Sequence, residues 1–387
     1  MSEKVIDFIR SAEQKEALLS KELTFYMKRK IICQSRAEQS RAEHIDILRI
    51  IACLMVIFNH TNERGFFRYV TDVPGTPAAV WNLLFSIACK SAVPIFFMIS
   101  GSMLLRKEEP VLATYRRIPR IIADYLIFSL VYYGCDAYLA GSPFSLKETL
   151  LKLVTVPYWH LWYLCSYVAL LVTLPFLRDF ARNLKLKNAV LLYGLAVFLM
   201  GIMPVFEYFV MPVNGSWKPS WISADIFIYP LLGYYVDNRV DVRKIPGKYM
   251  LVLWMADAMA FLVSERAEYC YLCREPGSYS EVFLCTGCII NAVTIFVTVK
   301  CLFSEKIYSR GMHLFLAETG KCTFGIYLIH ILILWKIKPF YSLWSAIEQT
   351  SAFGKQYGIF ISCIMVFMLA GMITYMLRKV PVIKKLL

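Results

Sequence analysis

The chain contains ten stretches of mostly apolar residues, each close to the length that a helix needs to cross a lipid bilayer. A helix of about 20 residues spans the hydrocarbon core, and a helix satisfies its own backbone hydrogen bonds there. The sequence therefore predicts an all-α fold, a polytopic transmembrane helical bundle of about ten spans. The stretches run approximately over residues 46–62, 79–105, 118–138, 159–177, 189–210, 222–236, 249–264, 280–299, 321–336 and 357–377.

Composition and charge agree with a membrane protein. The 387 residues are 58% hydrophobic and 18% charged, whereas soluble domains average about 45–50% apolar and about 25% charged residues. This balance argues against a soluble enzyme, a disordered chain and a nucleic-acid-binding domain, so no nucleic-acid partner is expected. Most of the 42 Lys and Arg residues fall in the two tails and the loops on their side of the membrane. The positive-inside rule therefore places both termini in the cytoplasm.

The chain divides into a membrane domain and two short tails. Residues 1–43 form a charged cytoplasmic tail, residues 44–380 the transmembrane domain, and residues 381–387 a cytoplasmic C-terminal tail. The first tail lacks the apolar core of a signal peptide, and either a surface helix or disorder fits it. Because the loops are short, the chemistry must be built from the helices and the loops between them.

The first span carries two ionisable residues on one face. Arg49 and His60 are eleven residues apart, so they differ by about 20° around a helix and by about 16 Å along it. Cys53 and Val56 lie between them on the same face and leave room. This pattern predicts a cation at the mouth of a channel and a titratable base farther along it. The alternative is an arginine that reaches the lipid headgroups and a histidine at the outer interface.

The second span places Lys90 near its middle. An ammonium group in lipid needs a counter-charge or an anionic ligand. An internal acid, for example Asp124 or Asp225, is the structural alternative to a ligand.

Further polar residues lie at the two membrane surfaces. Three arginines after the second span suit phosphate recognition, although ordinary positive-inside charge explains them too; they are Arg116, Arg117 and Arg120. On the outer side, histidines lie next to interfacial aromatic residues; this set is His160, Trp162, Tyr163 and His330.

Four cysteines have a spacing that can bind zinc in soluble loops. Cys270, Cys273, Cys285 and Cys288 follow the pattern C-x2-C-x11-C-x2-C. Two of them belong to a span, so unlinked thiols, a disulfide and a zinc site all stay open. No metal is expected.

Four motifs occur in order along the chain. An Arg and a His are separated by ten residues within the first span. Val-Pro-Ile-Phe-Phe-Met-Ile-Ser-Gly follows at 93–101, His-Leu-Trp-Tyr-Leu at 160–164 and Phe-Gly-Ile-Tyr-Leu-Ile-His at 324–330. Together they resemble the membrane-bound acyltransferase family 3, bacterial O-acetyltransferases of surface saccharides, over about residues 44–380. The chain departs from the family pattern at Lys90, often Arg, and at Ser102, commonly aromatic or large.

The resemblance implies an enzyme of the bacterial inner membrane. The donor is acyl-CoA, most simply acetyl-CoA, on the cytoplasmic side, and the acceptor is a hydroxyl of a surface saccharide or lipid-linked glycan. His60 then acts as general base or carries the acyl group, Arg49 lies on the channel, and Lys90 stabilises the oxyanion.

The remaining candidates take binding roles in this scheme. The CoA phosphates are bound by Arg116, Arg117 and Arg120. The acceptor is bound by His160, Trp162, Tyr163 and His330, and His330 is a second acid-base candidate. A carrier or permease for a small polar solute is the alternative, and the oligomeric state, including a homo-oligomer, stays open.

Overall fold

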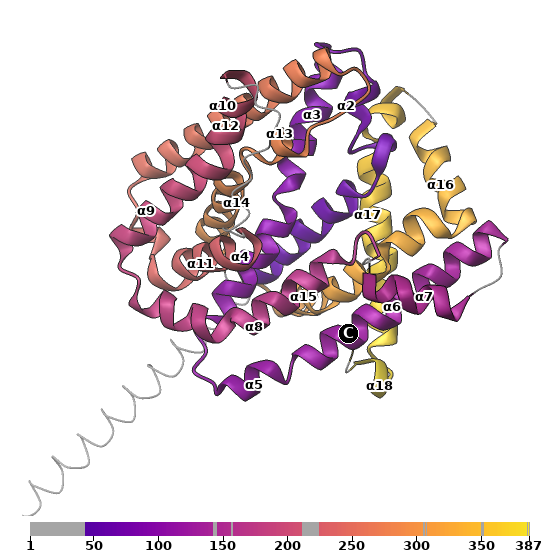
Figure 1. Ribbon diagram of the computed structural model, residues 1–387, viewed down its shortest axis with the longest axis horizontal. Coiled ribbons are helices and arrows are strands. Elements are labelled where there is room, and N and C mark those ends of the chain that lie inside the picture. Colours follow the sequence, from indigo (N-terminus) through magenta and orange to yellow (C-terminus); the bar gives the residue numbers. More distant parts are fainter. Residues whose placement is uncertain are drawn as a thin grey trace, which may run out of the picture.

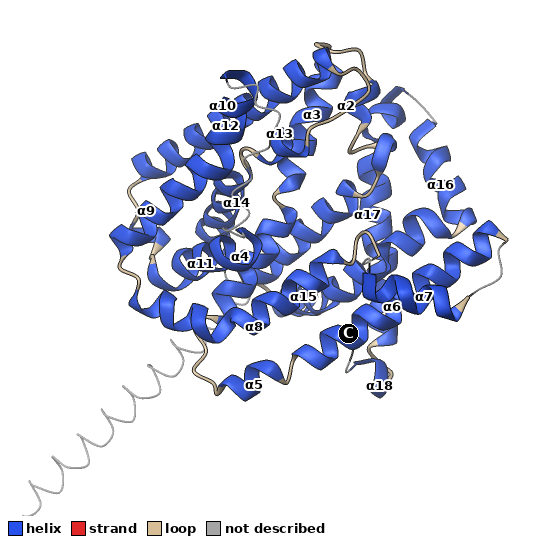
Figure 2. Ribbon diagram, in the orientation of Figure 1, coloured by secondary structure: helices blue, strands red, loops and turns tan. Residues whose placement is uncertain are grey.

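The computed structural model describes residues 43–141, 145–155, 158–210, 224–304, 306, 308–349, 352–384 and 386. The predicted tail over 1–43 lies outside this part, apart from Glu43. The described residues form helices and loops without any strand, which confirms the all-α prediction (Figure 2).

The helices follow one another with short connections. The first described helix covers residues 43–59. The others are η1 (Asn62–Arg64), α2 (Arg68–Thr71), α3 (Pro77–Lys90), α4 (Ala92–Leu104), α5 (Val111–Tyr115), α6 (Ile118–Ala140), α7 (Leu146–Thr155), α8 (Trp162–Asn183), α9 (Leu186–Val197), η2 (Phe198–Ile202), α10 (Met203–Val210), η3 (Ala224–Ile228), α11 (Tyr229–Tyr234), η4 (Tyr235–Arg239), η5 (Val242–Lys244), α12 (Gly247–Arg274), α13 (Glu281–Cys285), α14 (Cys288–Phe303), α15 (Arg310–Ile331), η6 (Leu332–Lys336), α16 (Lys338–Gln349), α17 (Ala352–Leu377) and α18 (Pro381–Lys384).

Within the described residues, eight helical segments are long and apolar enough to cross a membrane. They coincide with eight of the predicted spans. The other two predicted spans coincide with the helix over 43–59 and with the run η3–α11–η4, which are both short. The membrane-protein class is thus confirmed, while the number of spans and the cytoplasmic termini stay predictions. The eight segments are Pro77–Leu104, Val111–Ala140, Trp162–Asn183, Leu186–Val210, Gly247–Arg274, Glu281–Phe303, Arg310–Lys336 and Tyr357–Leu377.

The helices surround a central group that carries the site. Figure 1 shows α9, α10 and α12 on one side of the molecule and α6, α7 and α16 on the other. Helices α4, α11, α14 and α15 lie between these two sides. Arg49 lies within the helix over 43–59, and His60 follows directly after its last residue.

Helices α4 and α11 pack unusually closely through two glycines. A Cβ atom on Gly101 would lie 1.9 Å from the carbonyl oxygen of Pro230, and one on Gly233 would lie 1.9 Å from that of Met98. Only residues without a side chain permit such a backbone-to-backbone approach. The contact fixes the α4 wall of the site against α11.

A buried polar cluster ties the first helix to its neighbours. The Asp237 carboxylate of η4 lies 3.0 Å from Nε2 of His44 and 3.6 Å from Nζ of Lys300. It also accepts a hydrogen bond from the Ser102 hydroxyl of α4. These contacts hold the start of the helix over 43–59 against α4, η4 and α14.

The second predicted span breaks into two helices at Ser91, which caps both α3 and α4. Pro94 has no N–H, so the carbonyl of Lys90 loses its regular helical partner. Lys90 is therefore the last residue of α3, at the break.

Candidate functional site

One cavity of about 1220 Å³ connects the basic residues near the start of the first helix with the histidines beyond its end. We call these regions the cationic end and the histidine end. Arg49, Val56 and His60 all line the cavity, as expected for one helix face. Cys53 does not; its thiol is buried and lies 3.8 Å from the carbonyl oxygen of Thr323. The cationic end is lined by Arg49, Lys107, Arg116, Arg117 and Arg120, and the histidine end by His60, Asn62, Trp159 and His160.

Arg49 has a local acidic partner that the sequence did not single out. Its Nη1 donates to Oδ1 of Asp46 at 2.8 Å, and its Nη2 lies 2.9 Å from Sδ of Met103 on α4. About a quarter of the arginine side chain stays exposed. The guanidinium is thus oriented across the cavity wall and is still accessible to a ligand. The sequence could have indicated this pair, because residues three positions apart on a helix are neighbours.

His60 and His330 form a hydrogen-bonded pair. Nε2 of His330 lies 3.0 Å from Nδ1 of His60, and Nδ1 of His330 lies 2.7 Å from the carbonyl oxygen of Tyr327. The indole N–H of Trp335 donates to the His60 carbonyl oxygen at 2.7 Å. His330 is fully buried behind His60 and is not part of the cavity wall. It therefore contacts His60 and not the space in which an acceptor would lie.

These contacts fix the tautomers of the neutral pair. A carbonyl oxygen only accepts, so Nδ1 of His330 must carry its proton and Nε2 must be the acceptor. His60 then donates through Nδ1–H, and its own Nε2 keeps a lone pair. This is the arrangement of a base that a second group orients.

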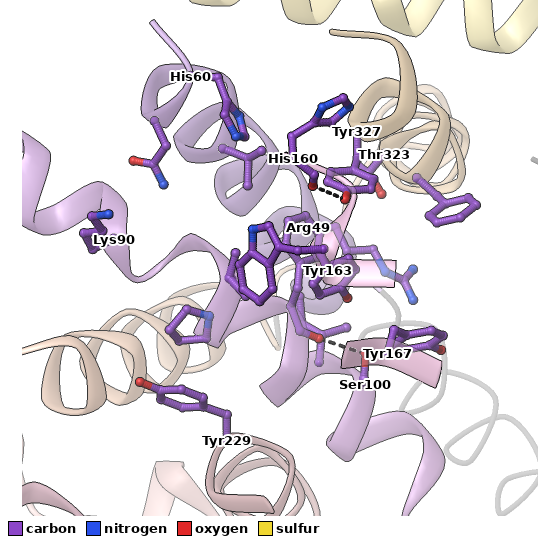
Figure 3. A pocket seen from close by; sticks show the side chains of 18 of the residues that line it. Arg49, His60, Lys90, Ser100, His160, Tyr163, Tyr167, Tyr229, Thr323 and Tyr327 are labelled. Carbon is purple, nitrogen blue, oxygen red and sulfur yellow. Dashed lines mark hydrogen bonds between the residues drawn. The ribbon is translucent and has the colours of Figure 1, made fainter. Parts of the chain in front are cut away.

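His160 lies beside His60 (Figure 3). Its ring centroid is 6.1 Å from that of His60 and 5.8 Å from that of His330. The side chain is 1% exposed, and neither ring nitrogen has a hydrogen-bond partner among the described residues. The backbone is held by the Tyr327 hydroxyl, which donates to the His160 carbonyl oxygen at 2.6 Å.

Lys90 lines the cavity and forms an ion pair with Glu281 of α13. Its ammonium nitrogen also lies 4.9 Å from the ring centroid of Phe66. Asp124, one of the two acids considered as a counter-charge, does not pair with Lys90, because its carboxylate is buried on α6 without a hydrogen-bond partner among the described residues. The side chain of Asp225 lies outside the described part. Tertiary packing alone brings Glu281 to Lys90, because 191 positions separate them.

The three predicted phosphate ligands all line the cationic end but differ in their surroundings. Arg117 donates to both Glu109 oxygens, at 2.5 and 2.7 Å, and Arg178 donates to the same carboxylate at 2.6 Å. Arg120 donates to the Leu386 carbonyl oxygen at 3.0 Å. Arg116 has no side-chain partner among the described residues, so it is the most available of the three.

Glu109, which was not predicted, neutralises part of this end. The hydrogen bond from Arg117, together with those from Arg178 and Thr114, holds the pKa of the Glu109 carboxyl well below its ordinary value. The carboxylate is therefore ionised and fixes the two guanidinium groups between α5 and α8. The sequence feature that could have indicated this contact is the acidic pair Glu108 and Glu109, shortly before α5 and the arginines that follow it.

Aromatic side chains form much of the remaining wall. Trp162 and Tyr163, both predicted, line the cavity, and Tyr163 packs 5.5 Å from the Tyr327 ring (Figure 3). Trp159, which was missed, lies 5.1 Å from the His60 ring. Beyond it, the rings of Phe67 and Tyr279 are 4.2 Å apart.

Two of the four spaced cysteines, Cys285 and Cys288, also line the cavity. None of the cysteines in the described part forms a disulfide. No group of three or more metal-binding side chains occurs among the described residues.

Comparisons with known proteins place the chain in a family. A family model described as an acyltransferase domain, that of acyltransferase family 3, matches residues 43–377. A curated relative, an amino-acid racemase of Enterococcus faecalis, is 30% identical over 166 residues, which are 40% of this chain and 22% of the relative. The chain thus spans less than a quarter of the length of that relative. No solved structure matches the chain.

The family match covers the first helix with Arg49 and His60, the cavity wall and α15 with His330. The chain belongs to acyltransferase family 3.

Proposed function

We propose that the protein transfers an acyl group, most simply acetyl, from acyl-CoA at the cationic end to a hydroxyl at the histidine end. The observation that carries this proposal is the continuous cavity that both Arg49 and His60 line. A donor bound at one membrane surface reaches an acceptor at the other only through such a passage. With the cationic end in the cytoplasm, as the loop charges predict, the acceptor lies outside.

The charge of the cavity suits an anionic donor. Among its described lining residues, six are Lys or Arg and one, Glu281, is acidic. Arg116 and Arg120 are the best candidates for the CoA phosphates, because Arg117 is already engaged by Glu109. Arg49 then lies where the acyl-bearing arm passes toward His60.

The His60–His330 pair supports general-base catalysis. Nε2 of His60 takes the proton of the acceptor hydroxyl while the hydroxyl oxygen attacks the thioester carbon. The carbon–sulfur bond then breaks, and the proton passes from His60 to the departing CoA thiolate. The products are the O-acyl ester and free CoA.

The aromatic wall supports a saccharide acceptor. Sugar rings stack on aromatic faces, and Trp159, Trp162, Phe67 and Tyr279 present such faces along the cavity. A cell-surface saccharide or lipid-linked glycan of a bacterial inner membrane fits this chemistry. An acetyl donor and a glycan acceptor are therefore the first substrates to test.

The test uses the full chain in membrane vesicles with acetyl-CoA labelled in the acetyl group. We expect label in base-labile esters of the surface glycan, and a loss of about 10²–10⁴-fold in His60→Ala. His330→Leu removes the acceptor of the His60 Nδ1–H and should lower turnover by about 10–100-fold. The matched control is His313→Gln, a histidine outside the cavity that pairs with Glu43. Normal turnover in His60→Ala contradicts the proposed mechanism.

A carrier for a small polar solute is the second candidate, because the same passage would serve it. The partial likeness to a protein named amino-acid racemase makes amino acids the first solutes to test. Uptake into vesicles without consumption of acetyl-CoA supports the carrier. Acyl transfer without uptake supports the enzyme.

A further inference from the structure

His160 is a buried polar side chain whose hydrogen-bonding groups have no use within the described fold. It is 1% exposed and lines the cavity, and both ring nitrogens lack partners among the described residues. A neutral imidazole carries one N–H donor and one acceptor nitrogen. Buried polar groups are paired in the great majority of proteins, and an exception requires an explanation. A ligand that enters the cavity supplies the missing partner.

The orientation of the ring is fixed before any ligand arrives. The Tyr327 hydroxyl holds the His160 backbone. The ring itself packs edge-to-face against Tyr132, at 4.5 Å between centroids, and against Trp159, at 5.4 Å. A donor held in this way needs no reorganisation when charge develops next to it.

The separation of the two rings suits a shared reacting group. The centroids of His60 and His160 are 6.1 Å apart, and the rings are inclined by 75°. Both residues line the same cavity. The two histidines can therefore contact neighbouring atoms of one reacting group. His60 is already the proposed general base.

We propose that the N–H of His160 donates to the carbonyl oxygen of the acyl thioester and stabilises the oxyanion that forms there. The proposal rests on the proposed acyl transfer. It assigns to His160 the role that the sequence suggested for Lys90, whose ammonium is engaged by Glu281. His160 is thus a catalytic residue rather than part of the acceptor subsite alone.

The acceptor oxygen forms a bond to the thioester carbon as its proton moves to Nε2 of His60. The carbonyl electron pair moves onto the carbonyl oxygen, which accepts the His160 hydrogen bond more strongly as it becomes negative. The pair returns when the carbon–sulfur bond breaks, and His60 gives its proton to the sulfur. His160 keeps its proton throughout.

The experiment compares His160→Phe and His160→Gln with the wild type in purified, detergent-solubilised full-length protein, with acetyl-CoA and the glycan acceptor. Loss of one oxyanion donor typically lowers kcat by about 10²–10³-fold. We expect this loss in His160→Phe with a KM for acetyl-CoA within about threefold of wild type, since the bond strengthens only in the transition state. His160→Gln keeps an N–H donor, so its kcat should be at least tenfold higher than that of His160→Phe. The acid limb of the kcat/KM profile, which reports His60, should stay in place.

Two controls separate this role from a loss of structure. Tyr132→Phe perturbs the same ring neighbours by removing the hydrogen bond to the Leu328 carbonyl oxygen. It should lower the unfolding temperature, and any loss of kcat should stay well below that of His160→Phe, because the ring that packs against His160 remains. Binding of a non-reactive thioether analogue of acetyl-CoA checks that the His160 variants are folded.

The outcomes are distinct. Wild-type kcat in His160→Phe, equal losses in His160→Phe and His160→Gln, or an effect confined to KM overturns the oxyanion role. Loss of the acid limb in His160→Gln makes His160 the base and overturns it as well. If the wild type itself shows no transfer from acetyl-CoA, the proposed function fails, whatever the variants do.

Discussion

The contact between α4 and α11 gives the sharpest prediction about the structure of the site. In Gly233→Ala the new Cβ atom would lie 1.9 Å from the carbonyl oxygen of Met98 and 2.4 Å from its carbonyl carbon. Ordinary contact begins at 3.4 Å, so the helices must separate by about 1.5 Å. No rotamer change relieves the clash, because the atoms belong to the backbone. Overpacking of this kind costs about 1–3 kcal/mol or more.

The assay is thermal unfolding in detergent, followed by intrinsic fluorescence and by retention of a monodisperse peak. A drop of about 1–4 °C is expected for Gly233→Ala. Gly101→Ala should behave alike, because its Cβ atom would meet Pro230 at the same distance. The double variant should lose less than the sum, since helices separated by the first methyl group accommodate the second. Acyl transfer should fall too, because both helices line the cavity.

Gly134→Ala is the matched control. This glycine lies inside α6, and a Cβ atom there would meet nothing within 4 Å. Alanine favours the helix by about 0.5–1 kcal/mol, so the control should unfold at the wild-type temperature or slightly above. Equal unfolding temperatures for Gly233→Ala and Gly134→Ala would falsify the close backbone contact.

Two further predictions concern the charges of the site. The lowered pKa of Glu109 means that the carboxylate stabilises the fold above its ordinary pKa of 4.5 and loses this effect as the pH falls toward the lower folded value. Unfolding temperature measured from pH 7 to pH 3 should therefore fall less steeply in Glu109→Gln than in wild type; parallel curves contradict the Arg117–Glu109 contact. For Lys90→Met we expect turnover to fall by less than about tenfold, which is a smaller loss than that of an oxyanion donor. In a double-variant cycle with Glu281→Gln, the free energies of unfolding should show a coupling of about 0.5–1 kcal/mol. If turnover instead falls by about a hundredfold or more, Lys90 is the residue that stabilises the oxyanion.

The sequence predicted the helices and one face of the site. Each apolar stretch coincides with a described helix, because the need to satisfy backbone hydrogen bonds in lipid is a local constraint. The shared face of Arg49 and His60 follows from helical periodicity alone. The break near Lys90 follows from the missing N–H of Pro94.

What the sequence could not supply were contacts between distant segments. Glu281 as the partner of Lys90, the close approach of Gly233 to Met98 and the separate surroundings of Arg116 and Arg117 depend on how helices pack, which no local pattern encodes. The same is true of His330, which local reasoning placed on the acceptor side and packing places behind His60.

By itself the sequence determined a membrane-embedded helical protein, its family likeness and the residues able to do chemistry, because hydrophobic length and helical period act within one segment. Only the tertiary structure decided which of these residues meet. His330 orients His60, and the ring nitrogens of His160 lack partners among the described residues, where the three separate segments that carry these histidines come together. Side-chain pairing across such distances is set by packing in three dimensions.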